Sequence, residues 1–160
     1  MKVSICVPAY GNADGIKRLL DSVRVQKYTD YEIVITDDSK TDEVSELVAK
    51  YLELHDDFAD RITYSKNETR LGAGNNWNRS IDIASGEYIK IMHHDDWFSS
   101  EESLGEFVRM LDDKTRAEIS RIGICRVETE REDFVRDVHH HGRCDVGSPF
   151  ADGSIKNFCE

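Results

Sequence analysis

The sequence predicts an α/β fold in which a mostly parallel β-sheet carries helices on both faces. Short runs of β-branched and apolar residues alternate along the chain with segments whose apolar residues recur every three or four positions. Repeated strand–helix units of this kind form parallel sheets, because each helix returns the chain to the start of the next strand. The length of 160 residues suits a single domain, and a domain of about 150 residues buries roughly two-thirds of its unfolded surface.

Five runs of residues have the composition of strands. Pro8 cuts off the first run, because proline has no N–H group to donate to a central ladder. The second run ends at Asp37 and Asp38, and the fourth is preceded by Gly86. The predicted strands cover residues 3–10, 31–39, 62–66, 88–92 and 122–127.

Four segments between these runs show helical periodicity. Asp14 is placed to cap the first helix, whose apolar residues between 16 and 23 share one face. Ser99 and Glu102 have the spacing of a capping box, which predicts that the fourth helix begins near Ser99. The second and third predicted helices cover residues 44–52 and 75–85.

Four polar residues directly follow the predicted strand 88–92. They are His93, His94, Asp95 and Asp96, and such groups are costly to bury without partners. Adjacent carboxylates repel each other, but their proximity becomes favourable when a hard divalent cation lies between them and a phosphate. Ligands of open α/β sheets bind outside the carboxyl ends of the strands. The run therefore indicates a metal–diphosphate site, with a solvated loop and a helix-capping aspartate as the alternative.

Composition argues against several classes of function. The formal net charge is −11 and no basic stripe is present, whereas nucleic-acid binding depends on neutralised phosphates. No apolar run approaches the roughly 20 residues that span a bilayer, and no signal peptide precedes the first strand. We expect a protein without nucleic-acid partners or a transmembrane segment, located in the cytoplasm or peripherally at the inner face of the membrane.

Four blocks of the sequence stand in an order and spacing that are informative together. They are Val3-Ser-Ile-Cys-Val-Pro-Ala-Tyr10, Ile35-Thr-Asp-Asp-Ser39, Asn67-Glu-Thr-Arg-Leu-Gly72, and Gly86-Glu-Tyr-Ile89 with Asp95-Asp96. The ordered set resembles the family 2 glycosyltransferases of the GT-A fold. The resemblance implies a nucleotide-sugar-binding GT-A core over residues 1–127. It also implies that the irregular residues 128–160 begin an incomplete acceptor-side region.

The resemblance implies a nucleotide site at the ends of the first two strands. Pro8, Ala9 and Tyr10 would line the pocket for the base, where an aromatic ring and exposed backbone suit a pyrimidine. Asp38 would accept a hydrogen bond from the imide N–H group of uracil, and Asp37 is the second candidate for this contact. The alternative for the two aspartates is a turn followed by a helix cap, since aspartate and serine are favoured there.

The resemblance also implies a diphosphate and metal site. Arg70 would reach the base or the diphosphate, unless it is an ordinary surface arginine. The family's acidic motif is Asp-x-Asp, but His93 occupies its first position here and is followed by His94. Asp95 is then the expected metal ligand, with Asp96 beside it, and His93 would contact the ribose or the metal. The cofactor would be Mn2+ or Mg2+, and imidazole favours manganese.

The activity implied by the resemblance is metal-dependent transfer of a sugar from a UDP-sugar to an acceptor hydroxyl, with inversion at the anomeric carbon. The acceptor would be a saccharide or a glycolipid of the cell envelope. Asp145 and Asp152 are available acids without a recognisable context, so the sequence assigns no catalytic base. We therefore expect this chain to bind nucleotide but to transfer sugar poorly.

Two other classes of protein stay open. A non-catalytic or incomplete nucleotide-sugar-binding module would keep the fold but would not transfer sugar. A nucleotidyltransferase would carry a loop rich in glycine and in lysine or arginine after its first strand, and residues 8–12 do not form one. Transfer or hydrolysis of sugar from a UDP-sugar would separate an enzyme from a binding module.

Overall fold

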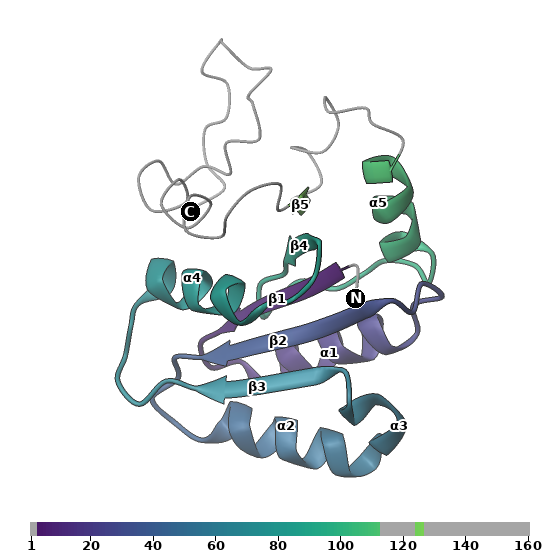
Figure 1. Ribbon diagram of the computed structural model, residues 1–160. Coiled ribbons are helices and arrows are strands. Elements are labelled where there is room, and N and C mark those ends of the chain that lie inside the picture. Colours follow the sequence, from purple (N-terminus) through teal and green to yellow (C-terminus); the bar gives the residue numbers. More distant parts are fainter. Residues whose placement is uncertain (1–2, 113–123, 127–160) are drawn as a thin grey trace.

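The computed structural model describes residues 3–112 and 124–126, which form one sheet flanked by helices (Figure 1). Strands and helices alternate through most of this part of the chain, as the sequence predicts. The strands are β1 (Val3–Ala9), β2 (Tyr31–Asp37), β3 (Ile62–Lys66), β4 (Tyr88–Ile91) and β5 (Ile124–Arg126). The helices are α1 (Ala13–Arg24), α2 (Glu43–Leu54), α3 (Asp56–Ala59), α4 (Ala73–Ile83) and α5 (Ser103–Asp112).

The strand order β3-β2-β1-β4-β5 places the first strand at the centre of the sheet. Strands β1 to β4 run parallel, whereas β5 pairs antiparallel with β4, so the predicted mostly parallel sheet is confirmed. The chain moves outward from β1 to β3 and then crosses to β4 on the other side of β1. Ligands of open α/β sheets bind at such a reversal, beyond the carboxyl ends of the strands.

Side chains of β1 alternate between two apolar layers, because successive residues of a strand point to opposite faces. Val3, Ile5 and Val7 lie in a core with side chains of α1, α2 and α5. Cys6 lies on the other face, in a second core with Ile81 of α4. All of these β1 side chains are fully buried. Helices thus cover both faces of the sheet, with α4 opposite α1 and α2 (Figure 1).

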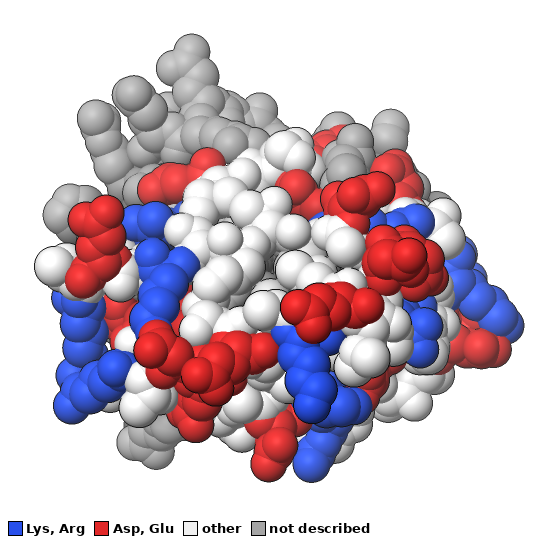
Figure 2. All heavy atoms as spheres, turned by 90° about the horizontal axis from the view of Figure 1, so that it is seen from below, with Lys and Arg blue, Asp and Glu red and all other residues white. Residues whose placement is uncertain are grey.

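Charged side chains of both signs are mixed on the surface. Figure 2 shows one face, on which Asp and Glu residues lie among Lys and Arg residues around an uncharged central area. The positive charge on this face is therefore not gathered into the stripe that binding to a phosphate backbone requires. Within the described ranges, no helix is both long enough and apolar enough to span a membrane.

Helix α1 is capped by a residue other than the predicted Asp14. Asn12 is the cap, and its Oδ1 accepts a hydrogen bond from the N–H group of Gly15 at 3.2 Å. Asn12 has φ 58° and ψ 56°, a left-handed conformation that asparagine adopts more readily than most residues. Asp14 instead lies in the first turn, where its charge favours the helix N-terminus.

Helix α5 begins at Ser103, so the predicted start near Ser99 is wrong. A separate turn precedes the helix, in which the N–H group of Ser100 donates to Ser103 Oγ at 3.2 Å. Glu102 forms a 2.7 Å ion pair with Lys27, the residue that also pairs with Glu101. The tertiary ion pair and the serine turn therefore replace the local capping box.

The amino ends of β1, β2 and β4 are joined by a compact hydrogen-bonded group. Ser4 Oγ accepts from the N–H group of Gly86 at 2.7 Å and donates to Glu32 Oε1 at 2.5 Å. The same carboxylate oxygen accepts from the N–H group of Ser85 at 2.6 Å. Gly86 approaches β1 so closely that a Cβ atom there would lie 2.7 Å from the nitrogen of Ser4. Only glycine allows this contact without movement of the backbone.

We expect Gly86→Ala to lower the free energy of unfolding by about 1–3 kcal/mol, because overpacking in a rigid site shifts the backbone. The added methyl group would also lie 2.9 Å from the carbonyl carbon of Val3. Gly74→Ala is the matched control, since a Cβ atom at Gly74 meets nothing within 4 Å. Urea unfolding followed by circular dichroism measures both variants. Equal stability of the two variants would contradict the proposed role of the close contact.

Candidate functional site

The residues singled out in the sequence lie at the carboxyl edge of the sheet. Tyr10 follows β1, Asp38 follows β2, and His93 follows β4. Because β1 lies between β2 and β4, the topology brings these three strand ends to one edge. Arg70 comes from the loop between β3 and α4, which reaches the same edge through its contacts with Asp38.

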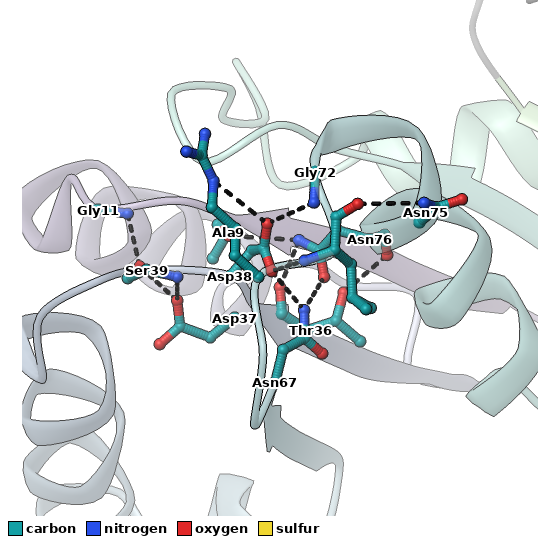
Figure 3. A network of polar contacts seen from close by, with 12 residues as sticks. Ala9, Gly11, Thr36, Asp37, Asp38, Ser39, Asn67, Gly72, Asn75 and Asn76 are labelled. Carbon is teal, nitrogen blue, oxygen red and sulfur yellow. Dashed lines mark hydrogen bonds and ion pairs between the residues drawn. The ribbon is translucent and has the colours of Figure 1, made fainter.

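The carboxylate of Asp38 organises the loop 67–72 (Figure 3). Its Oδ1 accepts from the N–H group of Leu71 at 2.7 Å and from Asn67 Nδ2 at 2.9 Å, and its Oδ2 accepts from the N–H group of Gly72 at 2.9 Å. Asp38 is only 5% exposed. Burial by itself raises the pKa of Asp38, but the hydrogen bonds from the loop stabilise the carboxylate, so the pKa lies below its ordinary value.

Asn76 of α4 connects this loop with the two central strands. Its Nδ2 donates to the carbonyl oxygens of Thr36 at 3.0 Å and Ala9 at 3.3 Å, and its Oδ1 accepts from Asn67 Nδ2 at 2.9 Å. Asn76 is buried beneath the edge of the sheet. Sequence reasoning did not find Asn67 or Asn76. For Asn76, the sequence did contain an indication: it is an asparagine at an inward-facing position of a predicted helix, where an apolar residue would be expected.

Arg70 and Tyr10 form the exposed part of this group. The guanidinium carbon of Arg70 lies 4.8 Å from the centre of the Tyr10 ring, and its Nε lies 4.0 Å from Asp38 Oδ2. Tyr10 is 44% exposed, so its ring is accessible to a ligand. The loop that Asp38 holds therefore places a cation over an aromatic ring at the edge of the sheet.

Asp37, Pro8 and Ala9 lie below the exposed surface. All three are buried, and the carbonyl oxygen of Ala9 accepts a hydrogen bond from the N–H group of Asp38 at 3.0 Å. Asp37 Oδ1 accepts from the N–H and Oγ–H groups of Ser39, and Asp37 Oδ2 accepts from Tyr64 Oη at 2.7 Å. Burial, followed by the bond to Asp37, raises the pKa of the Tyr64 hydroxyl. The carboxylate of Asp37 is thus occupied by protein donors.

The loop after β4 forms a turn closed by Asp96. Its Oδ2 accepts from the N–H group of His93 at 2.9 Å, and its own N–H group donates to the carbonyl oxygen of His93 at 2.9 Å. The His93 ring packs edge-on against Trp77 of α4, with 4.8 Å between ring centres. His94 contributes its carbonyl oxygen to a 3.5 Å contact with Asn12 Nδ2. Asp95 and Asp96 are exposed.

The donors of this loop suit a metal ion that is shared with a ligand. Within the residues that the structure describes, no three His, Cys, Asp or Glu side chains are grouped to hold a metal by themselves. Asp95 presents an exposed carboxylate, and Asp96 uses one of its oxygens to close the turn. Magnesium-type sites commonly combine one or two carboxylates with substrate phosphates and water. The loop therefore fits a metal bound together with a diphosphate.

The two acids considered for catalysis, Asp145 and Asp152, lie outside the described residues. The residues of the site described above come instead from the loops after β1, β2, β3 and β4. They can bind an aromatic base, a negatively charged group and a divalent cation, through a ring, a guanidinium and exposed carboxylates. These are the components of a nucleotide-binding site.

Comparison with known proteins gives a consistent result. The model of glycosyl transferase family 2 matches residues 4–147. A poly(ribitol-phosphate) beta-glucosyltransferase of Bacillus spizizenii is 33% identical over 103 residues, which are 63% of this chain and 16% of the relative. The UDP-Glc:alpha-D-GlcNAc-diphosphoundecaprenol beta-1,3-glucosyltransferase WfaP of Escherichia coli is 34% identical over 96 residues, 60% of this chain and 36% of the relative. The chain thus spans well under half the length of these relatives.

Solved structures show the same likeness. A mannosyltransferase from Pyrobaculum calidifontis in complex with GDP-Man and Mn2+ has a TM-score of 0.65 and 29% identity, covering 71% of this chain and 33% of that chain. The TarS protein of Staphylococcus aureus, residues 1–349 in complex with UDP-GlcNAc, has a TM-score of 0.58 and 27% identity. This likeness covers 71% of this chain and 32% of that chain. Both likenesses therefore include the sequence as well as the fold.

We expect Asp38→Asn to lower the free energy of unfolding by about 1.5–3 kcal/mol at pH 7, because hydrogen bonds to a charged group are lost. The pKa of Asp38 is below its ordinary value of 3.8 in the folded state. Its ionised form therefore stabilises the fold above pH 3.8, and this contribution is lost as the pH falls through the folded-state pKa. The stability difference between wild type and variant should shrink accordingly in acid.

Urea titrations at a series of pH values from 7 to 3 measure this difference. Asp57→Asn is the control, because Asp57 is an exposed carboxylate whose replacement should change stability by no more than about 0.5 kcal/mol. A constant difference between wild type and Asp38→Asn across this pH range would contradict the assignment of the loop's stability to the ionised carboxylate.

Proposed function

Because the chain belongs to glycosyl transferase family 2 and has the GT-A fold of its solved relatives, we propose that it binds a nucleotide sugar and transfers the sugar to an acceptor hydroxyl. The observation that carries the proposal is the buried Asp38, which holds the loop that places Arg70 over the exposed ring of Tyr10. This group lies at the carboxyl edge of the central strands, where ligands of open α/β sheets bind.

We assign the base of the donor to Tyr10 and Asp38. The ring of Tyr10 offers a stacking surface, and Asp38 Oδ2 accepts one close protein donor, from Gly72. An ionised carboxylate oxygen can accept more than one hydrogen bond, so Oδ2 keeps capacity for the imide N–H of uracil. The TarS structure with UDP-GlcNAc supports a uracil nucleotide, whereas the mannosyltransferase structure contains GDP-Man. We favour a UDP-sugar because uracil offers both a ring to stack on Tyr10 and an imide N–H group to donate to Asp38.

We assign the diphosphate to Arg70 and to the loop after β4. Arg70 lies next to the base site, and its exposed guanidinium can turn toward an anion. Asp95, with the remaining oxygen of Asp96, would hold Mn2+ or Mg2+ beside the diphosphate. When bound, the metal would neutralise negative charge that develops on the leaving diphosphate. His93 lies at the same loop, with its ring held by Trp77.

We propose direct displacement at the anomeric carbon, which inverts its configuration, onto an acceptor hydroxyl. The names of the relatives include a poly(ribitol-phosphate) polymer and a lipid-linked sugar as acceptors. A saccharide or lipid-linked acceptor, presented at the cytoplasmic face of a membrane, is the corresponding proposal for this chain. The base that removes the acceptor proton is not assigned to any described residue.

A nucleotide-sugar-binding module without transfer is the second candidate. Two observations favour it: His93 occupies the first position of the acidic motif, and the carboxylate of Asp96 is partly used to close the turn. Both leave fewer hard oxygen ligands for a metal. Incubation with UDP-sugars and measurement of released UDP separates the candidates, because a binding module would release none above the uncatalysed rate.

We expect UDP to bind at least about tenfold more tightly than ADP or GDP, which corresponds to about 1.4 kcal/mol. The reason is that uracil can donate its imide N–H group to Asp38 Oδ2 while its ring stacks on Tyr10, whereas adenine has no such group and guanine carries its N–H group on a larger, two-ring base. Isothermal titration calorimetry with the three diphosphates in the presence of MnCl2 measures the affinities. Equal affinities would refute the uracil assignment, and tighter binding of GDP would replace it with guanine.

We expect Asp95→Asn to reduce the gain in UDP affinity that Mn2+ gives, because the amide keeps the shape but removes an anionic ligand. Binding of UDP in EDTA should stay unchanged, since the base contacts lie on the loops after β1 and β2. Titrations with and without metal measure both quantities, and Asp57→Asn is the control for loss of one surface carboxylate. An unchanged gain in Asp95→Asn would remove Asp95 from the metal site.

A further inference from the structure

The first turn of α1 lies against the loop that follows β4. A Cβ atom placed on Gly15 would be only 2.2 Å from the carbonyl oxygen of His94. Asn12 spans the same contact, since its Oδ1 accepts from the N–H group of Gly15 at 3.2 Å and its Nδ2 lies 3.5 Å from that carbonyl oxygen. The backbone of α1 therefore approaches the backbone of the loop closely at Gly15, and the Asn12 side chain lies beside this contact, with its Nδ2 2.3 Å from where a Cβ atom on Gly15 would stand.

Apart from this contact, glycine at position 15 is unfavourable for the stability of helix α1. Glycine weakens a helix relative to alanine, because it loses more conformational freedom on folding. Gly15 lies within α1, and its φ is not in the left-handed region that would require glycine. By contrast, a Cβ atom on Gly105 of α5 would make only an ordinary contact, 3.7 Å from Tyr28 Cβ. The backbone of His94, with the Asn12 side chain beside it, thus leaves room only for glycine at position 15.

We infer that Gly15 is a positioning residue for the loop 93–96, and that the absence of a side chain there sets where Asp95 stands. This inference rests on the proposed function for the ligand that Asp95 would meet. The turn between His93 and Asp96 is closed by two hydrogen bonds, so the loop moves as a unit. A methyl group on residue 15 would meet the end of the Asn12 side chain, which can turn away, and the backbone carbonyl oxygen of His94, which can give way only if that unit moves.

The size of the displacement is large enough to matter for binding. Moving the carbonyl oxygen of His94 from 2.2 Å to the 3.0 Å that real contacts require is a shift of about 0.8 Å. Ligand-binding constellations must be held within roughly 0.5 Å of their productive geometry. Asn12 can turn its side-chain end away from residue 15 without moving Tyr10, and Asp38 belongs to another loop, so the base contacts should keep their positions. The effect should therefore fall on the metal-dependent part of nucleotide binding.

The test uses the full chain with Gly15→Ala, and Gly105→Ala as the matched control. Calorimetric titration of UDP in EDTA and in MnCl2 gives the gain in affinity due to metal for each protein. We expect Gly15→Ala to lose at least about tenfold of this gain while its affinity in EDTA stays within about twofold of wild type. We expect Gly105→Ala to retain the whole gain. A full metal gain in Gly15→Ala would overturn the inference.

A second measurement does not depend on nucleotide binding. The chain contains two tryptophans, so Trp97→Phe leaves Trp77 as the sole indole, with the His93 ring 4.8 Å away. A histidine ring in contact with indole quenches its emission, so displacement of the loop by Gly15→Ala should raise the emission of Trp77. Unchanged emission would overturn the inference, whereas a wild-type chain that binds no nucleoside diphosphate would overturn the proposed function alone.

Circular dichroism first establishes that Gly15→Ala is folded. If it is not, Asn12→Gly takes its place, because glycine suits the left-handed backbone of residue 12 and removes only the side-chain contacts with Gly15 and His94. The same rise in Trp77 emission and a smaller loss of the metal gain, about twofold to threefold, are then expected. If Asn12→Gly shows neither the rise in Trp77 emission nor the loss of the metal gain, the inference is overturned.

Discussion

The buried carboxylate of Asp38 is the interaction on which the carboxyl edge of this domain depends. Fixing the backbone of a loop costs about 1–2 kcal/mol per residue in conformational entropy, and the loop 67–72 has few apolar side chains to offset that cost. Charged hydrogen bonds to Leu71 and Gly72 supply the compensation in a place that water scarcely reaches. Arg70 has a defined position over Tyr10 only because this carboxylate orders the residues on either side of it.

The hydrogen-bonded network of Asp38, Asn67 and Asn76 also includes one unfavourable feature. Asn67 donates to both Asp38 and Asn76, yet its own Oδ1 is buried without a hydrogen-bond partner in the part of the chain that the structure describes. An unpaired buried acceptor is unfavourable by roughly 1–3 kcal/mol. The network is therefore arranged to hold the loop and the start of α4 in one geometry, at some expense in stability. Such an arrangement is common where a protein positions groups for a ligand.

Periodicity and strand composition were enough to predict the sheet, four of the helices and the edge at which Tyr10 and Asp38 lie, but they missed the short α3 and placed the start of α5 too early. These signals succeed because burial of apolar faces decides the elements, and because parallel strands end together. The sequence was not enough to show that Asp37 would be enclosed by Ser39 and Tyr64, or that Asn12 would cap α1. Both depend on tertiary contacts between residues that are distant in the chain or on a left-handed backbone, which composition and spacing do not encode.

The hydrogen-bonded group around Ser4, Glu32 and Gly86 has a consequence for how such domains diverge. It joins three strands at the amino edge, on the far side of the sheet from the loops that meet a ligand. Changes in those loops can therefore accumulate without loosening the strands that carry them. A lineage built on this plan can acquire new donors and acceptors through its loops while the amino edge is inherited almost intact. The residues that stabilise the fold and the residues that determine ligand specificity can therefore evolve independently.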